Sequence, residues 1–85
     1  MSTRLLYFAW VKEKVGVASE DVALPPDVAT IAELMTWLKS RGPEFAHAFD
    51  RSEVIRAAID QSHVRHDARI GAAREIAFFP PVTGG

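Results

Sequence analysis

The chemically distinctive group of this chain is the carboxylate of its last residue, Gly85, which closes the run 78–85 (FFPPVTGG). A C-terminal carboxyl group has a pKa of about 3.5, so it is ionised and nucleophilic at neutral pH. Gly84 and Gly85 carry no Cβ atom, so this terminus can be drawn through a channel too narrow for other residues. The first candidate site is therefore a nucleophilic carboxylate carried on a tether.

Use of that carboxylate would depend on a partner. A carboxylate is a poor acyl donor, but an enzyme that uses ATP can convert it to an acyl-adenylate. Sulfur can then be accepted at the acyl carbon, which gives a thiocarboxylate. This product is a sulfur nucleophile on a tether, and it requires no cysteine in a chain that has none.

The other residue types offer less chemistry. The histidines are His47, His63 and His66, and the pair His63-x-x-His66 lacks a third ligand at useful spacing, so we expect no metal site. Neither a G-x-S-x-G motif nor a glycine-rich phosphate loop occurs. We therefore expect the body to bind no cofactor and not to be catalytic alone.

Composition indicates one soluble globular domain. The chain has 85 residues, of which 48% are hydrophobic and 25% charged. Ten basic against eleven acidic residues give a net charge of −1, which provides no reason to expect nucleic acid or an anionic membrane as a partner. No apolar run approaches the roughly 18 residues of a membrane span. With no cysteine and no signal-peptide pattern, a cytoplasmic location is expected.

Hydrophobic alternation predicts the strands that must hold the tail. The strand-like segments are 3–8, 20–24, 54–60, 63–65 and 74–79. Segments 3–8 and 74–79 are apolar on both faces, which predicts that they are neighbouring central strands covered on both sides. Parallel neighbours need a crossover, and the helical segments between them can supply it.

Three segments between these strands favour helix. Segment 9–15 ends at Gly16, and segment 44–49 can form a short helical turn. The clearest helix is 30–41, where Thr30 and Glu33 form a capping-box pair and an apolar stripe follows. The prediction is an α+β roll of the β-grasp (ubiquitin-like) kind, with a mixed sheet of four or five strands packed on one main helix.

The two prolines after the last strand divide the chain. Proline has no N–H to donate to a ladder, so Pro80 and Pro81 should end any pairing. We therefore expect a β-grasp domain over residues 1–79 and an extended tail over residues 80–85.

With these features the chain resembles the small, sulfur-carrier subunits of molybdopterin synthase. The resemblance covers nearly the whole length and rests on three segments: FFPPVTGG (78–85), LLYFAWVKEKVG (5–16) and AAIDQ (57–61). It implies that a ubiquitin-activating-type adenylyltransferase, using ATP and Mg, adenylates Gly85, and that a sulfur donor protein then supplies the sulfur of the thiocarboxylate. It further implies that Thr83 and Gly84 enter the large subunit, where sulfur passes to cyclic pyranopterin monophosphate. The working synthase would be a heterotetramer of two large subunits with a small subunit at each end.

The same resemblance implies a docking surface for the large subunit. It maps to Phe8, His63, Phe79 and Pro80, with His63 standing where an aliphatic residue is expected. A second departure is Ala73-Arg74 in the turn where relatives carry Gly-Asp. The alternative for Phe8 and Phe79 is that both are ordinary core residues.

Three other functions compete with this interpretation. The chain could carry sulfur for another pathway, such as thiamine synthesis or tRNA thiolation. It could be a ubiquitin-like modifier whose Gly85 forms isopeptide bonds with lysines. It could also be an interaction module with an inert tail.

Overall fold

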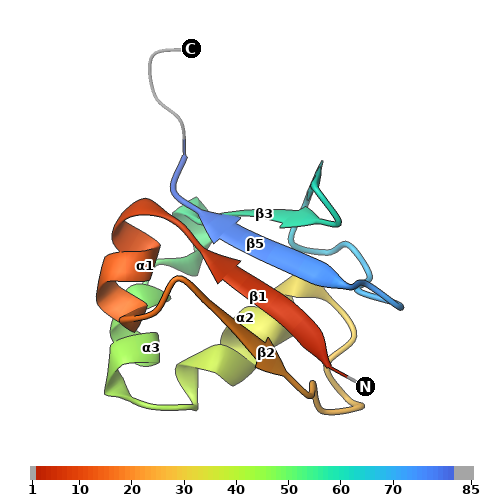
Figure 1. Cartoon of the computed structure of the whole chain (residues 1–85), viewed down its shortest axis with the longest axis horizontal. Helices are drawn as coiled ribbons and strands as arrows, with labels where there is room; N and C mark the ends of the chain where they lie inside the picture. The colour runs from red at the N-terminus through yellow and green to blue at the C-terminus, as the bar shows by residue number, and fades with distance from the viewer. Residues whose placement is uncertain (1, 82–85) are drawn as a thin grey trace.

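The computed structural model describes residues 2–81, which form one mixed sheet and one layer of helices (Figure 1). The strands are β1 (Thr3–Tyr7), β2 (Ser19–Val22), β3 (Arg56–Ile59), β4 (Ser62–Val64) and β5 (Glu75–Phe79). The helices are α1 (Ala9–Val15), α2 (Ile31–Lys39), α3 (Pro43–Ala48) and the 3-10 helix η1 (Ser52–Val54). The predicted α+β β-grasp architecture is confirmed. No helix within residues 2–81 has the length and apolar content needed to cross a membrane.

The two end strands of the described chain pair in the middle of the sheet. The strand order is β2-β1-β5-β3-β4, and β1 runs parallel to β5 with Leu5 opposite Ile76 and Tyr7 opposite Phe78. The remaining pairs are antiparallel. This confirms that the two most apolar strands are central neighbours. It also brings the end of β1 beside the end of β5.

The helices cover only one face of this sheet, because α1, α2 and α3 all contribute buried residues to one core; Figure 1 shows α2 behind the strands, with α1 and α3 at the left. Leu5 and Tyr7 on that face are buried, as are Ile76 and Phe78. On the other face Leu6 is half-buried and Phe8 is 48% exposed. The prediction that β1 and β5 are covered on both sides is therefore wrong, because within residues 2–81 all three α-helices pack on the same side. We call the uncovered side the open face.

Local signals in the sequence fix two of the helices. Gly16 follows α1 with a φ of 98° and donates its N–H to the Lys12 carbonyl, the left-handed stop expected of glycine. Thr30 and Glu33 form the predicted capping box at the start of α2. However, α2 ends at Lys39 rather than Arg41, because the backbone N–H and the hydroxyl of Ser40 both donate to the Trp37 carbonyl and tighten the last turn.

Several strand boundaries also differ from the prediction. β3 begins at Arg56, since Ser52–Val54 forms η1. Asp60 and Gln61 have φ values of 47° and 72°, so they form the two-residue hairpin turn, and β4 starts one residue early at Ser62. β2 spans Ser19–Val22 instead of 20–24. Despite these shifts the predicted segment 54–60 still contributes to the core, since Ile55 and Ala57 are each 1% exposed.

Candidate functional site

The tail begins where β5 ends. Phe79 is the last residue of the strand, and Pro80 and Pro81 follow it outside any strand or helix. At this end β5 is held to both of its neighbours: the Phe8 N–H donates to the Phe78 carbonyl at 3.1 Å, and Phe79 pairs with Arg56 of β3. The predicted functional residues Thr83, Gly84 and Gly85 lie outside the described residues. What the structure shows is the surface around Pro80 and Pro81, the last residues that it describes.

Four residues predicted from the sequence to dock a partner lie together at this point. The ring centroids of His63 and Phe79 are 5.0 Å apart on the open face. Because Tyr7 pairs with Phe78 in parallel register, the next residues, Phe8 and Phe79, are neighbours at the end of the two strands. Pro80 directly follows and is half-buried. We call Phe8, His63, Phe79 and Pro80 the exit surface.

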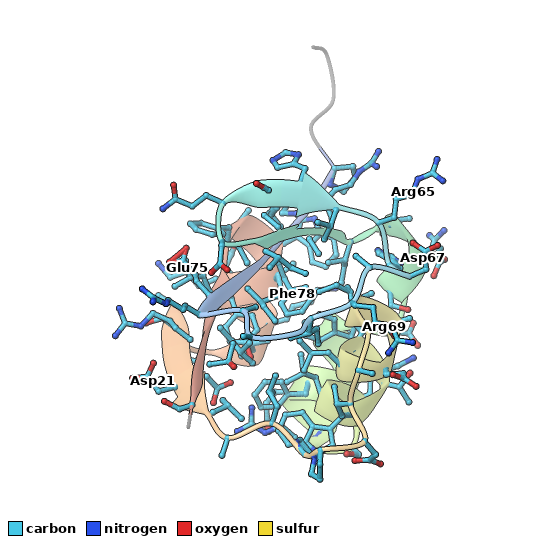
Figure 2. The ribbon with its side chains drawn as sticks, turned by 90° about the vertical axis from the view of Figure 1, so that its right-hand side faces the viewer. Asp21, Arg65, Asp67, Arg69, Glu75 and Phe78 are labelled. Carbon is cyan, nitrogen blue, oxygen red and sulfur yellow. The ribbon has the colours of Figure 1, made fainter. Side chains whose placement is uncertain are left out.

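The structure separates the exit surface from the core. Phe8 is 48% exposed and Phe79 is half-buried, whereas their chain neighbours Tyr7 and Phe78 are buried. In Figure 2 Phe78 lies between the sheet and the helices. Phe8 and Phe79 therefore do not occupy the core positions that the alternative interpretation would give them. Whether they bind a partner stays a prediction.

Buried aromatic rings hold the two strands beneath the exit surface. The Tyr7 and Phe78 rings stack with centroids 6.2 Å apart, and Phe49 meets Phe78 edge-on at 5.2 Å. Edge-to-face and offset contacts of this kind add about 0.5–1.5 kcal/mol beyond the area that they bury. These ring contacts on the covered face therefore hold in place the ends of β1 and β5, where Phe8 and Phe79 lie.

A polar cluster on the covered side completes this support. The Tyr7 hydroxyl donates to a Glu20 carboxylate oxygen at 2.7 Å, and Arg41 donates to both oxygens of Glu20 at 2.8 and 3.0 Å. The Arg41 guanidinium also lies 4.7 Å from the centre of the Phe45 ring. We call Tyr7, Glu20 and Arg41 the clamp. It joins β1, β2 and the segment between α2 and α3.

The clamp shifts the ionisation of its members. Burial, with the hydrogen bond to the Glu20 carboxylate, raises the pKa of the Tyr7 hydroxyl far above its ordinary value, so it stays a donor. Burial alone would raise the pKa of Glu20, but hydrogen bonds from Arg41 and Tyr7 and the charge of Arg41 bring that pKa below its ordinary value. The clamp is a fixed ion pair rather than a proton-transfer site.

The histidines are not arranged as ligands. His66 Nε2 lies 2.7 Å from the Ile55 carbonyl, while His63 contacts Phe79. Among the described residues no group of three or more His, Cys, Asp or Glu side chains is placed to hold a metal ion.

Sequence reasoning missed two residues beside the exit surface. Val17 is 46% exposed, and the Tyr7 N–H donates to the Ala18 carbonyl, which places Val17 across from Phe8. Arg56 is exposed and pairs in register with Phe79. The signal for Arg56 was available, because it is the one charged side chain inside the strand segment 54–60, which otherwise has a charge only at its last residue, Asp60. Val17 follows the Gly16 stop, where no periodic pattern applies.

Comparison with known proteins places this arrangement in a family. The family model described as the ThiS family matches residues 5–85. The molybdopterin synthase sulfur carrier subunit of Escherichia coli (strain K12) is 35% identical over 82 residues, which cover 96% of this chain and 98% of that protein. The protein of the same name from Haemophilus influenzae is 35% identical over 81 residues, with coverage of 95% and 96%. That of Dictyostelium discoideum is 36% identical over 84 residues, with coverage of 96% and 94%.

Solved structures agree on the fold. SAMP1 from Haloferax volcanii superposes with a TM-score of 0.71 at 22% identity and full coverage of both chains. A putative molybdopterin converting factor, subunit 1, from Pyrococcus furiosus gives a TM-score of 0.73 at 22% identity, covering 96% of this chain and 99% of that one. Taken with the family model and the curated relatives, which match over nearly the full length, the chain belongs to the ThiS family, alongside the molybdopterin synthase sulfur carrier subunits.

Proposed function

We propose that this chain is the sulfur carrier subunit of molybdopterin synthase, working in the cytoplasm. The observation that carries the proposal is 35% identity to curated carrier subunits over nearly the whole of both chains. The match to the family model runs through to Gly85, the residue that would carry the sulfur. The position of β5 supports the same function, since this central strand directs the end of the chain out beside the exit surface.

The proposed chemistry takes place on Gly85 in three steps. At a ubiquitin-activating-type adenylyltransferase, the carboxylate attacks the α-phosphorus of Mg-bound ATP, and pyrophosphate leaves. A persulfide on a sulfur donor protein then attacks the acyl-adenylate and displaces AMP, and a thiol cleaves the resulting acyl disulfide, which releases the thiocarboxylate and leaves a disulfide on the donor. In the large subunit this sulfur forms a bond to a side-chain carbon of cyclic pyranopterin monophosphate, and the oxygen that this carbon carried leaves with the electron pair of the broken carbon–oxygen bond. Hydrolysis of the acyl–sulfur bond leaves the sulfur on the substrate and restores the carboxylate.

The rest of the chain would act by positioning. Thr83 and Gly84 would occupy the narrow approach to the large subunit's active site, where side chains without bulk are required. Phe8, His63, Phe79 and Pro80 would rest on the large subunit outside that approach. Exposed aromatic side chains grouped on a small domain are typical of interfaces. Two large subunits with one small subunit at each end would form the heterotetramer.

Intact mass spectrometry after expression with the activating enzyme tests the carrier function. We expect the mass of the chain to increase by one oxygen-to-sulfur exchange at Gly85. Higher-mass conjugates on lysines would instead indicate a modifier. A thiocarboxylate that yields no molybdopterin with the large subunit and substrate would indicate a carrier for another pathway, and an unchanged mass would indicate an inert tail.

A length change at the C-terminus tests the role of Gly85 directly. Deleting Gly85, or adding one residue after it, should abolish molybdopterin formation because the activated carbon is missing or displaced. The thermal midpoint should stay unchanged, since residues 80–85 follow the last strand. A one-residue extension before Met1 is the matched control and should retain activity. Molybdopterin formation by the Gly85 deletion would contradict the mechanism.

A further inference from the structure

The centre of the open face is apolar, as the pairing of residues between neighbouring strands shows. Leu6, Ala77 and Ala58 are successive cross-strand neighbours on β1, β5 and β3, and His63 continues this row on β4. Phe8 and Phe79 stand in the next row toward the tail. No helix within residues 2–81 covers this surface, which adjoins the exit of the tail (Figure 1).

Positive charge is concentrated beside the tail exit. Arg56 lies directly across from Phe79, and Arg65 follows the end of β4. Both arginines are exposed, and they line the same hollow of about 390 Å³. In Figure 2 Arg65 stands above Asp67. Neither arginine takes part in an ion pair among the described residues.

The acidic groups near these arginines do not cancel their charge. The hollow is also lined by Glu53, His66 and Asp67. Glu53 already pairs with Arg51 at 3.4 Å. With that pair counted as neutral, two arginines face one carboxylate, that of Asp67.

The far end of the open face differs, because its charges are balanced. There Arg4 pairs with Asp21 at 3.2 Å, and Arg74 and Glu75 line the same hollow as these two residues. Figure 2 shows Asp21 and Glu75 on the side of the sheet away from Phe78. Among these side chains the charges sum to zero at the far end, whereas one positive charge is left over beside the end of β5.

We infer that the surface of the large subunit that meets this chain is acidic beside the opening that admits the tail, with carboxylates facing Arg56 and Arg65. The inference rests on the proposed function, from which the identity of the partner comes. Apolar contact with Leu6, Phe8 and Phe79 would supply most of the binding, and the charges would set the orientation and speed of association. Complementary charges act mainly in this way, fixing register and raising the association rate.

Charge reversal tests this inference. We expect Arg56→Glu to weaken the affinity for the large subunit by about tenfold or more at low salt, as calorimetric titration would measure. Arg69→Glu is the matched control, because Arg69 is also an exposed arginine but lies away from the open face. Its backbone forms an isolated β-bridge with Thr30 at the start of α2, on the covered side. We expect its affinity to stay within about twofold of the wild type.

A salt titration of the wild-type pair gives a second measurement that needs no variant. The dissociation constant should rise as sodium chloride increases, because salt screens the pairing of exposed charges. Equal affinities for Arg56→Glu and the wild type, or an affinity that salt does not weaken, would overturn the inference. Failure of the wild-type chain to bind the large subunit at all would instead overturn the proposed function.

Discussion

Aromatic residues that are adjacent in the sequence lie on opposite faces of the sheet and differ in burial. Tyr7 and Phe78 point to the helices and are at most 1% exposed. Phe8 and Phe79 follow them immediately, yet Phe8 is 48% exposed and Phe79 is half-buried. One residue along each strand thus separates a core position from a surface position. The covered face supplies the core of this small domain, whereas no helix within residues 2–81 covers the open face.

Their charges differ in the same way. Arg41 on the covered side donates to both oxygens of Glu20 and lies over the Phe45 ring, so its position is fixed. Arg56 on the open face has no carboxylate partner within residues 2–81. A paired arginine contributes to the fold, whereas an exposed arginine without a partner is available to another protein. The comparison predicts that substitutions on the two faces change different measurements.

The largest difference is expected between Phe78→Ala and Phe79→Ala. Phe78 is fully buried, so its truncation should lower the free energy of unfolding by about 3–5 kcal/mol, measured by urea denaturation. Phe79 is half-buried, and its truncation should cost only about 1 kcal/mol. In calorimetric titration with the large subunit, Phe79→Ala should lose affinity by about tenfold or more.

The control for this pair is Phe78→Leu, which keeps an apolar side chain in the core if the alanine variant does not fold. It should be destabilised less than Phe78→Ala while binding the large subunit like the wild type. If Phe79→Ala instead loses about 3–5 kcal/mol of stability, Phe79 is part of the core and the exit surface is wrong.

The next effect is expected at the clamp. Arg41→Gln should lower the free energy of unfolding by about 1–2 kcal/mol, because Glu20 loses both of its charged hydrogen bonds in a partly buried setting. Arg4→Gln is the matched control: its pair with Asp21 is about 60% exposed on both sides, and its loss should cost less than about 0.5 kcal/mol. Equal losses for the two variants in urea denaturation would contradict the distinction between the faces.

The clamp also predicts a dependence of stability on pH. The pKa of Glu20 in the folded chain lies below its ordinary value of 4.5, so its ionised form stabilises the fold above pH 4.5. This contribution is lost as the pH falls through the lowered pKa. Glu20→Gln should therefore show a smaller loss of stability below pH 4.5 than the wild type, with Glu13→Gln as the exposed control. The dependence should decrease rather than vanish, since Glu33 and Glu53 also have lowered pKa values.

Much of the fold was predictable because local signals and packing agree. The apolar pattern of 74–79 identified β5 as a central strand, and the capping box at Thr30 identified the start of α2. The parallel pairing of the end strands followed from their apolar character, and it placed Phe8 beside Phe79. The contacts of the exit surface therefore followed from the strand order.

The rest depended on interactions between distant segments. Both faces of β1 are apolar, so periodicity could not decide which one the helices would cover. Arg41 was assigned to the last turn of a helix, but its partner Glu20 lies 21 positions earlier and is reached only in the folded chain. The exposure of Val17 likewise depends on where the helix layer is absent, and no periodic pattern reports it. The exposure of Arg56 was different, because its charge inside an apolar strand segment was visible in the sequence.

The smallest effect is expected at the start of α2, and it tests whether the faces are independent. Thr30→Ala removes the capping hydrogen bond to the Glu33 N–H and should cost about 1 kcal/mol in urea denaturation. Thr36→Ala, on the exposed side of the same helix, removes only a bond to the Ala32 carbonyl and should be neutral or slightly stabilising. Because α2 packs on the covered face, neither variant should change the affinity for the large subunit. A loss of affinity for Thr30→Ala at a temperature where the domain remains folded would mean that the helix layer controls the open face, and the two faces would then have to be treated as one coupled unit.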